Sequence, residues 1–352
     1  MDKIVTFMQH SIHQHMIRKI LLPALIVLIS CQSPDKGKIL TVTGPIDAEE
    51  AGLTLSHEHL LVDFIGADSI GYHRWNRDSV AEKVLPFLEE LQQYGCRTFI
   101  ECTPAFLGRD PLLLKSLSEK SSIYILTNTG YYGARDNKFV PGEMSDLSAR
   151  EISAIWIDEF KNGIEGSGIR PGFIKIAVDP SEKLSDMHHK LVEAAILTHK
   201  ETGMVIASHT GPEGPAFAQL DLLEEYKVPA SAFIWVHAQR GSTEANIEAA
   251  RRGAWISLDN INGKRDVNPG SNYSTTWYLE RLLRLKEEGL LKHVLLSHDA
   301  GWYRPGEPGG GEFRGYTDIF TTLIPALKEH GFTEDEIMQM MIHNSANAFA
   351  IR

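Results

Sequence analysis

The chain has 352 residues, of which 43% are hydrophobic and 23% are charged, and its formal net charge is −11. This length fits either two modest domains or one large α/β barrel. Its 35 Lys and Arg residues are scattered among 46 acidic residues, whereas a protein that binds a duplex needs a clustered cationic face. We therefore exclude nucleic acid as a partner.

The N-terminal region has the pattern of an export signal. A cationic segment, Met16 to Lys19, precedes an apolar run, Ile20 to Ile29, that is too short to cross a bilayer as a stable helix. The final segment, Leu28-Ile29-Ser30-Cys31, resembles a bacterial lipoprotein box, in which the cysteine becomes the lipidated N-terminus. An ordinary secretory signal or an uncleaved anchor are the alternatives.

These patterns predict the organisation of the chain. Residues 1–30 are expected to form a signal peptide with Met16 as the initiator, residues 31–38 a tether, and residues 39–352 the folded domain. We expect an exported lipoprotein, periplasmic or on the cell surface, that contacts the membrane only through a lipid on Cys31.

Two further cysteines, Cys96 and Cys102, lie six residues apart in one predicted strand. At about 3.3 Å per residue their Cα atoms would be about 20 Å apart, and a disulfide needs less than about 7 Å. We expect two free thiols in the core.

From residue 39 onward, short apolar runs alternate with helical patterns. The predicted strands are Leu53–His59, Thr98–Thr103, Ile123–Gly130, Gly172–Val178, Met204–His209, Ala232–His237, Trp255–Leu258 and Val294–His298. The predicted helices are Val80–Tyr94, Asp110–Ser118, Ser148–Gly163, Ser185–Thr202, Pro215–Tyr226, Thr243–Arg252, Thr275–Glu288 and Tyr316–His330. Eight strand–helix units predict a single-domain α/β fold, a TIM-type (β/α)8 barrel. An open doubly wound sheet is the competitor, but no glycine-rich turn follows the first strand.

Ligand-type side chains occur at or near the ends of five predicted strands. His57 and His59 alternate with Glu58 and should share a face. Lys175 interrupts an apolar strand, which is costly for a buried amine unless it is paired or chemically altered. An isolated His-x-His pair is usually incidental, and an isolated lysine of this kind usually extends to solvent.

Three later strands end in the same manner, with His209, with His237, and with His298 followed by Asp299. The carboxyl ends of barrel strands open on one face, where the chemistry of such folds takes place. Residues far apart in sequence are therefore expected to meet there.

The order His-x-His, Lys, His, His, Asp resembles that of the amidohydrolase superfamily, and most closely the phosphotriesterase family with its lactonase branch. The similarity covers the whole mature chain. It includes the segments Gly172–Ala177, Thr129–Tyr132, Ser297–Asp299 and Ile324–Leu327 with the following Gly331.

This resemblance implies a centre of two divalent metal ions. His57, His59 and Asp299 would hold the more buried ion, and His209 and His237 the more exposed one. Lys175, carboxylated by CO2 to a carbamate (N6-carboxylysine), would bridge both ions and so become an anionic oxygen ligand. Zinc suits several imidazoles best, and Mn2+, Co2+ or Fe2+ fit the same ligands.

The resemblance also implies a reaction. A hydroxide that bridges the metals would attack the substrate, and Asp299 would accept its proton. Tyr132 resembles the tyrosine that lactonase-type relatives place over this hydroxide. Asn260, however, stands where those lactonases usually carry an arginine. His298 and Glu58 should face away from the centre and serve structural roles.

The loop after the last strand could form a lid over the pocket. Trp302, Tyr303 and Arg304 precede a glycine-rich stretch, and these three residues with Asn260 are the candidate substrate contacts, although the loop could equally be an exposed connection.

We expect a small-molecule substrate, a lactone or carboxylic ester. The alternatives are a phosphotriesterase or phosphodiesterase, and a lipoprotein that binds a ligand without catalysis. Family resemblance suggests a homodimer.

Overall fold

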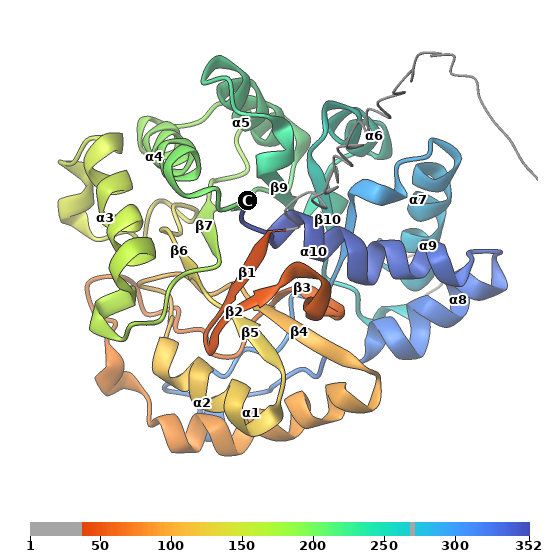
Figure 1. Cartoon of the computed structure of the whole chain (residues 1–352), viewed down its shortest axis with the longest axis horizontal. Helices are drawn as coiled ribbons and strands as arrows, with labels where there is room; N and C mark the ends of the chain where they lie inside the picture. Colours follow the sequence, from red (N-terminus) through yellow and green to blue (C-terminus); the bar gives the residue numbers. More distant parts are fainter. Residues whose placement is uncertain (1–36, 268–271) are drawn as a thin grey trace, which may run out of the picture. The chain divides into compact units, whose positions relative to one another are not determined.

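The computed structural model describes residues 37–267 and 272–352, and they form a closed (β/α)8 barrel (Figure 1). The parallel strands of the barrel are β3 (Leu53–Glu58), β4 (Cys96–Glu101), β5 (Tyr124–Leu126), β6 (Asn128–Thr129), β7 (Phe173–Ala177), β8 (Ile206–His209), β9 (Phe233–Val236), β10 (Trp255–Leu258) and β11 (Val294–Leu296). The predicted TIM barrel is therefore confirmed. The predicted third strand is divided at Thr127 into β5 and β6.

Two hydrogen-bonded sheets make up the barrel wall, in the orders β3-β4-β5 and β6-β7-β8-β9-β10-β11. At the seam between β11 and β3, the His57 amide donates to Ser297 Oγ at 2.9 Å, and the Asp299 amide donates to the His57 carbonyl at 3.1 Å. These bonds join the last strand to the first and bring the two ends of the ligand pattern together.

Helices surround the strands as a ring (Figure 1). They are α1 (Arg77–Gln93), α2 (Pro111–Ser121), α3 (Ala149–Asn162), α4 (Asp186–Thr202), α5 (Glu213–Glu225), α6 (Thr243–Arg252), α7 (Thr275–Glu287), α8 (Ile324–Glu329), α9 (Glu334–Met338) and α10 (Asn344–Phe349). Most begin at a side-chain cap, such as Ser148 on α3, which accepts from the Glu151 amide. Predicted and observed bounds of the first seven helices agree within a few residues.

The predicted helix Tyr316–His330 is wrong in detail. Its first half is the π-helix η10 (Ile319–Leu323), and only the second half is the α-helix α8. Pro325 cannot donate a backbone hydrogen bond, and its ring crowds the carbonyl four residues earlier, which accounts for the wider turn. A second π-helix, η11 (Gln339–His343), joins α9 to α10.

Alternating strand residues build two layers of core. Side chains such as Phe173, Ala207, Ile234 and Leu295 belong to an inner cluster that also includes residues of the N-terminal hairpin and α10. Their strand neighbours belong to a larger cluster packed against the helices. The inner cluster therefore fills the barrel beneath the strand ends, so the carboxyl ends form a floor on which a site can be built.

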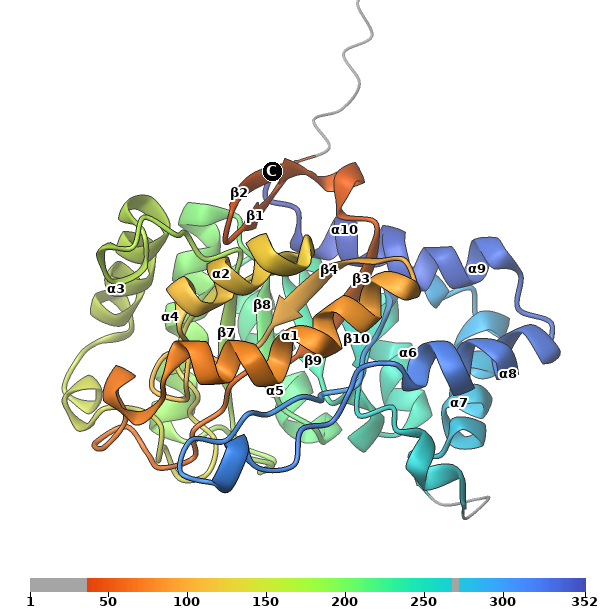
Figure 2. The ribbon, with the colours of Figure 1, turned by 90° about the horizontal axis from the view of Figure 1, so that it is seen from below.

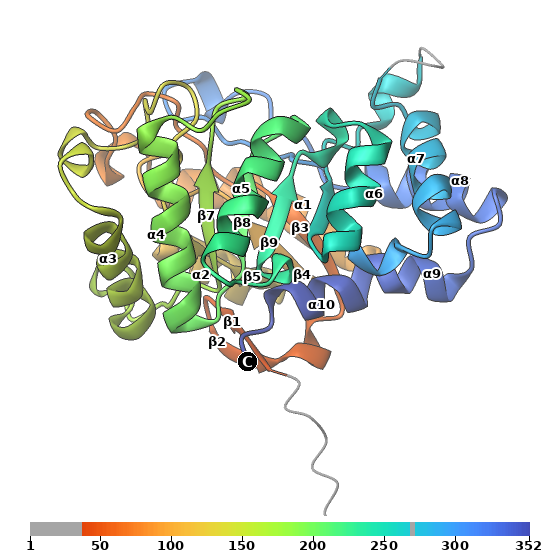
Figure 3. The same ribbon diagram turned by 90° about the horizontal axis from the view of Figure 1, so that it is seen from above.

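A hairpin that the sequence analysis did not predict, β1 (Lys38–Thr41) with β2 (Gly44–Asp47), covers the amino-terminal end of the barrel. The Val42 amide donates to the Ile125 carbonyl at 2.8 Å, at the start of β5. Figures 2 and 3 show this hairpin and the C-terminus at one end of the barrel and the long loops after the strands at the other. The first strand of the hairpin begins at Lys38, next to the predicted start of the domain at residue 39.

Cys96 and Cys102 are buried and not disulfide-bonded, as predicted. The predicted signal peptide, Met16 and Cys31 lie outside the described residues. None of the helices in the described ranges is long and apolar enough to cross a bilayer.

Candidate metal centre

The first strand carries a β-bulge at the point where it reaches the site. The register of β3 against β4 shifts between Leu55 and Glu58, where one extra residue is inserted. Leu55 packs in the outer layer, and the bulge turns both His57 and His59 into the barrel and Glu58 out of it. The predicted common face of the two histidines is observed, but regular alternation from Leu55 would have pointed them the other way.

Two other inward side chains depend on left-handed backbone. His237 has φ 61° and Asp299 has φ 50°. Trp235 belongs to the outer layer, so strict alternation would also direct His237 outward, and its positive φ reverses this direction. Such conformations cost about 1–3 kcal/mol each and persist where the surrounding structure holds them, often at functional sites.

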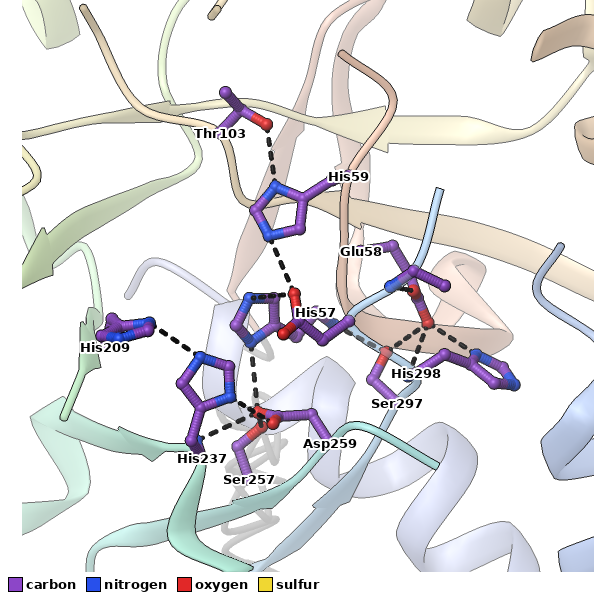
Figure 4. A network of polar contacts seen from close by, with 12 residues as sticks. His57, Glu58, His59, Thr103, His209, His237, Ser257, Asp259, Ser297 and His298 are labelled. Carbon is purple, nitrogen blue, oxygen red and sulfur yellow. Dashed lines mark hydrogen bonds and ion pairs between the residues drawn. The ribbon is translucent and has the colours of Figure 1, made fainter. Parts of the chain in front are cut away.

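The ligand-type atoms of these residues converge (Figure 4). His59 Nε2 lies 3.2 Å and His57 Nε2 lies 3.8 Å from Asp299 Oδ1, and His57, His59 and Asp299 can each offer one ligand atom within 4.8 Å of the others. His237 Nε2 lies 2.7 Å from His209 Nδ1. The structure thus brings His57, His59 and Asp299 together and places His237 beside His209. A second group, His57, His237 and Asp259, also has ligand-type atoms within 4.8 Å of one another.

Lys175 lies in the middle of β7 and is 1% exposed. In the described part of the chain, no hydrogen bond or ion pair to its amine is found. Burial lowers the pKa of Lys175, against the opposing effects of Cys102, Asp299 and Asp259. The amine is close enough to the site that its charge contributes to the lowered pKa of His57 and His209.

Asp259, which was not among the predicted site residues, contacts His57 and His237 through their Nδ1 atoms, on the side away from the site. Its carboxylate lies 3.2 Å from His57 Nδ1 and 2.5 Å from His237 Nδ1. It also accepts from the His237 amide, Gln239 Nε2 and Ser257 Oγ at 3.1, 2.8 and 2.9 Å. Both imidazoles must carry a proton on Nδ1 to donate to it, which leaves each Nε2 lone pair directed at the site.

His59 has a separate support. Its Nδ1 lies 2.8 Å from Thr103 Oγ1, and this hydroxyl lies 2.5 Å from Glu101 Oε1. Burial raises the pKa of Glu101 to about 7. The sequence signal for both supports is the same, a polar residue directly after an apolar strand: Thr103 follows the end of β4 and Asp259 follows β10.

Glu58 and His298 form a pair on the other side of the same strands, as predicted. Both are fully buried, and Glu58 Oε1 lies 2.7 Å from His298 Nδ1. Figure 4 shows this pair displaced from the histidine cluster. His298 Nε2 accepts from the Ile319 amide at 3.0 Å, at the start of η10.

The charge states suit metal binding. Burial, aided by Lys175, lowers the pKa of His57 to about 4, and burial with the neighbouring His237 lowers that of His209. Burial would raise the pKa of Asp299, but the His59 hydrogen bond and the nearby imidazoles hold it below its usual range. Near neutral pH the imidazoles of His57 and His209 are uncharged and the Asp299 carboxylate is ionised, which are the forms that bind a cation. His237 differs, because burial lowers its pKa but the neighbouring Asp259 raises it above the usual value.

Three of the four predicted substrate contacts line a cavity at the mouth, and Tyr132 lies beside His209. Tyr132 Oη lies 3.1 Å from His209 Nδ1, and the Trp302 ring meets the edge of His59 with centroids 5.8 Å apart. A cavity of about 470 Å3 at Asp299 is lined by residues that include Asn260, Trp302 and Arg304. Tyr303 is not among its lining residues, because its ring packs toward Gly310.

Arg314 also lines this cavity, but its guanidinium is engaged by backbone carbonyls. It donates to Ile261 O at 2.9 Å, to Asp299 O at 3.1 Å and to His298 O. It therefore fixes the loop that carries Asp299, and Arg304 is paired with Glu307 at 3.1 Å.

A (β/α)8 barrel with histidine and aspartate groups able to bind metal at its strand ends defines a class, the metal-dependent hydrolases of the amidohydrolase type. The family model described as "Phosphotriesterase family" matches residues 37–349. The chain belongs to the phosphotriesterase family of the amidohydrolase superfamily, and it is a hydrolase.

Relatives of this chain carry several names. It is 28% identical to the "Phosphotriesterase homology protein" of Escherichia coli K12, over 86% of this chain and 99% of the relative. It is 27% identical to the "Aryldialkylphosphatase" of Saccharolobus solfataricus, over 87% and 97%, and 25% identical to the "N-acetyltaurine hydrolase" of Salmo salar, over 88% and 96%. The solved structure of an organophosphorus hydrolase from Deinococcus radiodurans has a TM-score of 0.77 and 27% identity, covering 89% of this chain and 97% of that one.

Proposed function

We propose that the chain is a hydrolase of a lactone or carboxylic ester, with two divalent metal ions as cofactors. The observation that carries the proposal is the convergence of His57, His59 and Asp299 beside His209 and His237 at the strand ends. Buried polar groups are normally satisfied by protein partners. Here the inward atoms mainly face one another, which suits a cation between them.

The residues fit the metals that the family implies. Lys175 supports a bridging position, because it is buried, lacks a partner among the described side chains, and has a lowered pKa. A neutral amine can take up CO2 and release a proton, which gives an anionic carbamate. Several imidazoles favour Zn2+, and Mn2+, Co2+ or Fe2+ would suit the same donors. When bound, two such ions supply an activated water near neutral pH.

The protein side chains would then orient the substrate and move the proton. Asp299 is ionised and borders the mouth cavity, so it can accept a proton at its carboxylate and pass it to the leaving group. Tyr132 supports an oxygen-containing substrate, because its hydroxyl stands at His209. Trp302 covers His59 from the side of the loop and would exclude water from one edge of the site.

Phosphotriester cleavage is the second candidate. It is supported by the names of two relatives, the aryldialkylphosphatase and the organophosphorus hydrolase, and by Asn260, which stands at the mouth in place of the arginine usual in lactonases. The name of the third relative adds an amide substrate to the compounds worth testing.

The test is a panel of substrates with protein loaded with Zn2+, Co2+ or Mn2+. Lactones and aryl esters are compared with paraoxon-like triesters and with N-acetyltaurine. The proposal expects the highest kcat/KM on a lactone or ester and none after chelation. Preference for triesters would move the assignment to the second candidate.

One variant separates an enzyme from a binding protein. Asp299→Asn should reduce kcat/KM by about 100- to 10,000-fold, because a positioned general base contributes that much. The metal content of the variant is measured alongside. If metal-loaded wild type cleaves no compound of the panel, a non-catalytic ligand-binding lipoprotein becomes the better assignment.

We also propose an exported, lipid-anchored homodimer. The lipoprotein-box resemblance around Cys31 supports the anchor, and family resemblance supports the dimer. Detergent partitioning of wild type against Cys31→Ser tests the first, and light scattering of the detergent-free domain tests the second.

A further inference from the structure

Asp259 contacts one histidine from each of the two groups of ligand-type residues. His57 lies with His59 and Asp299, and it also forms a second group with His237 and Asp259, whereas His237 lies against His209. The Nδ1 atoms of His57 and His237 nevertheless meet the same carboxylate, at 3.2 and 2.5 Å. Figure 4 shows Asp259 behind the two rings, on the side away from the ligand-type nitrogens.

The Asp259 carboxylate is itself held rigidly. It is 0% exposed and accepts five hydrogen bonds, two from imidazole nitrogens and three from the His237 amide, Gln239 and Ser257. The His57 and His237 interactions keep the pKa of Asp259 well below its usual range, although burial alone would raise it. Its acceptor capacity is therefore used by protein donors, so we treat it as a support for the imidazoles and not as a ligand.

His59 has a support of its own, because its Nδ1 meets Thr103. The Tyr132 hydroxyl lies at His209 Nδ1, the same nitrogen that faces His237, so it is not a support of this kind. A support that orients a metal-binding histidine and raises its basicity commonly contributes 10- to 100-fold in metal affinity or activity. Of the supports in the described residues, Asp259 alone reaches a histidine of both groups.

We infer that Asp259 is a positioning residue that couples the two ion positions, so that the ions are bound and lost as a pair. When an ion binds through His57, the ring and the carboxylate are fixed together, and the orientation of His237 is fixed with them. The second ion then meets an already ordered ligand. This inference rests on the two-metal centre of the proposed function.

The experiment compares two nearly isosteric variants. In Asp259→Asn, the amide can accept from one imidazole but presents an N–H2 group to the other. In Thr103→Val, only the support of His59 is removed. Each protein is dialysed against graded chelator, and the metal per chain is measured by mass spectrometry. The Co2+ absorption spectrum reports ligand geometry independently of activity.

The expected results differ between the variants. Wild type should lose both ions in one transition. Asp259→Asn should lose the two ions in separate transitions, the first at a chelator strength about 10- to 100-fold lower than in wild type, with an altered Co2+ spectrum. Thr103→Val should bind the ions more weakly but still lose both in one transition, because its Asp259 is intact. Thermal unfolding of the metal-free proteins checks that the variants are folded.

Other outcomes overturn the inference. Asp259→Asn that matches wild type, or that still loses both ions in one transition, would show that the carboxylate does not couple the positions. If Asp259→Asn fails to fold, Ser257→Ala replaces it, because it removes one donor to the carboxylate and should separate the two transitions by a smaller factor. Wild type that binds no metal would contradict the proposed function itself, which is a different result.

Discussion

The inner and outer faces of the same two strand ends hold opposite kinds of polar cluster. Glu58 and His298 face outward, and the Glu58 carboxylate accepts from Ser297 Oγ, from the His298 amide and ring, and from the Ala300 amide at 2.7 to 2.9 Å. Their sequence neighbours His57, His59 and Asp299 face inward. The Nε2 atoms of His57 and His59 lie 3.8 and 3.2 Å from Asp299 Oδ1.

This difference distinguishes buried polar side chains that stabilise the fold from those that are arranged for chemistry. The outward pair is fully satisfied by protein donors, as buried polar groups usually are. The inward group brings imidazole and carboxylate lone pairs close to the buried Lys175 amine, with few protein donors between them. The outer pair holds the backbone of this group, and Asp259 holds two of its rings. We expect damage to the inner group to reduce activity, and damage to the outer pair to reduce stability.

The largest effect is expected from the inner group. Lys175→Met removes the amine but keeps the volume, so two-metal binding should be lost and kcat/KM should fall by about 1,000-fold, since the ions supply several kcal/mol to the reaction. The metal-free variant should unfold at a temperature equal to or above that of metal-free wild type, because an uncompensated buried amine is removed. Metal analysis, kinetics and calorimetry measure these effects. A variant that binds two ions as tightly as wild type would rule out Lys175 as a bridge.

The outer pair should show the opposite result. Glu58→Gln places an N–H2 group against protein donors and should reduce the free energy of unfolding by about 3 kcal/mol at pH 7. Its effect on kcat/KM, measured well below the unfolding temperature, should be small by comparison. A large loss of activity in a protein of normal stability would break the contrast between the two faces.

Low pH should remove the stabilisation that the ionised Glu58 gives the folded protein. Burial would raise the pKa of Glu58, but His298 and the hydrogen bonds to the carboxylate hold it below its usual value. A carboxyl group with a lowered folded-state pKa stabilises the protein above its unfolded pKa, and this stabilisation is lost as the pH falls through the folded pKa. The difference in unfolding free energy between wild type and Glu58→Gln, from denaturant titrations, should therefore be full at pH 7 and shrink below pH 4.5.

A smaller effect is expected at the rim of the inner group. Tyr132→Phe removes the hydroxyl that lies 3.1 Å from His209 Nδ1, and kcat/KM should fall by about 10-fold, the equivalent of one hydrogen bond. Metal content should stay at the wild-type value. If the ion at His209 is lost instead, Tyr132 supports the ligand and does not act on the substrate.

The smallest effect concerns the two thiols. Burial raises the pKa of Cys96 to about 12 and that of Cys102 well above its usual value. Both should stay protonated and unmodified by a thiol reagent at pH 8 in the native protein, and both should react after denaturation, as peptide mapping by mass spectrometry would show. Rapid native labelling of Cys102 would mean that the inner core opens.

The sequence predicted the barrel and the convergence of ligand-type residues because both follow from periodicity and strand ends. Each ligand-type residue stands where an apolar strand ends or is interrupted by a polar group. These residues are His57, His59, Lys175, His209, His237 and Asp299. Parallel topology then brings them to one face.

The rest depends on tertiary detail. The bulge before His57 and the positive φ of His237 are backbone conformations that the local sequence pattern does not determine. Alternation from Ser257 directs Asp259 inward, but its contacts with His57 and His237 join residues far apart in the sequence and cannot be predicted from the strand pattern. The π-helix at Ile319 follows from Pro325 only once the helix is seen to be packed against His298.

The two ends of the described chain meet away from the candidate metal centre. Lys38 pairs with Ile351 through bonds of 3.0 and 2.8 Å, at the hairpin end of the barrel (Figure 2). The strand ends that carry His57, His209 and Asp299 lie at the opposite end, so a group attached through either end of this domain would leave the mouth of the site open to solvent.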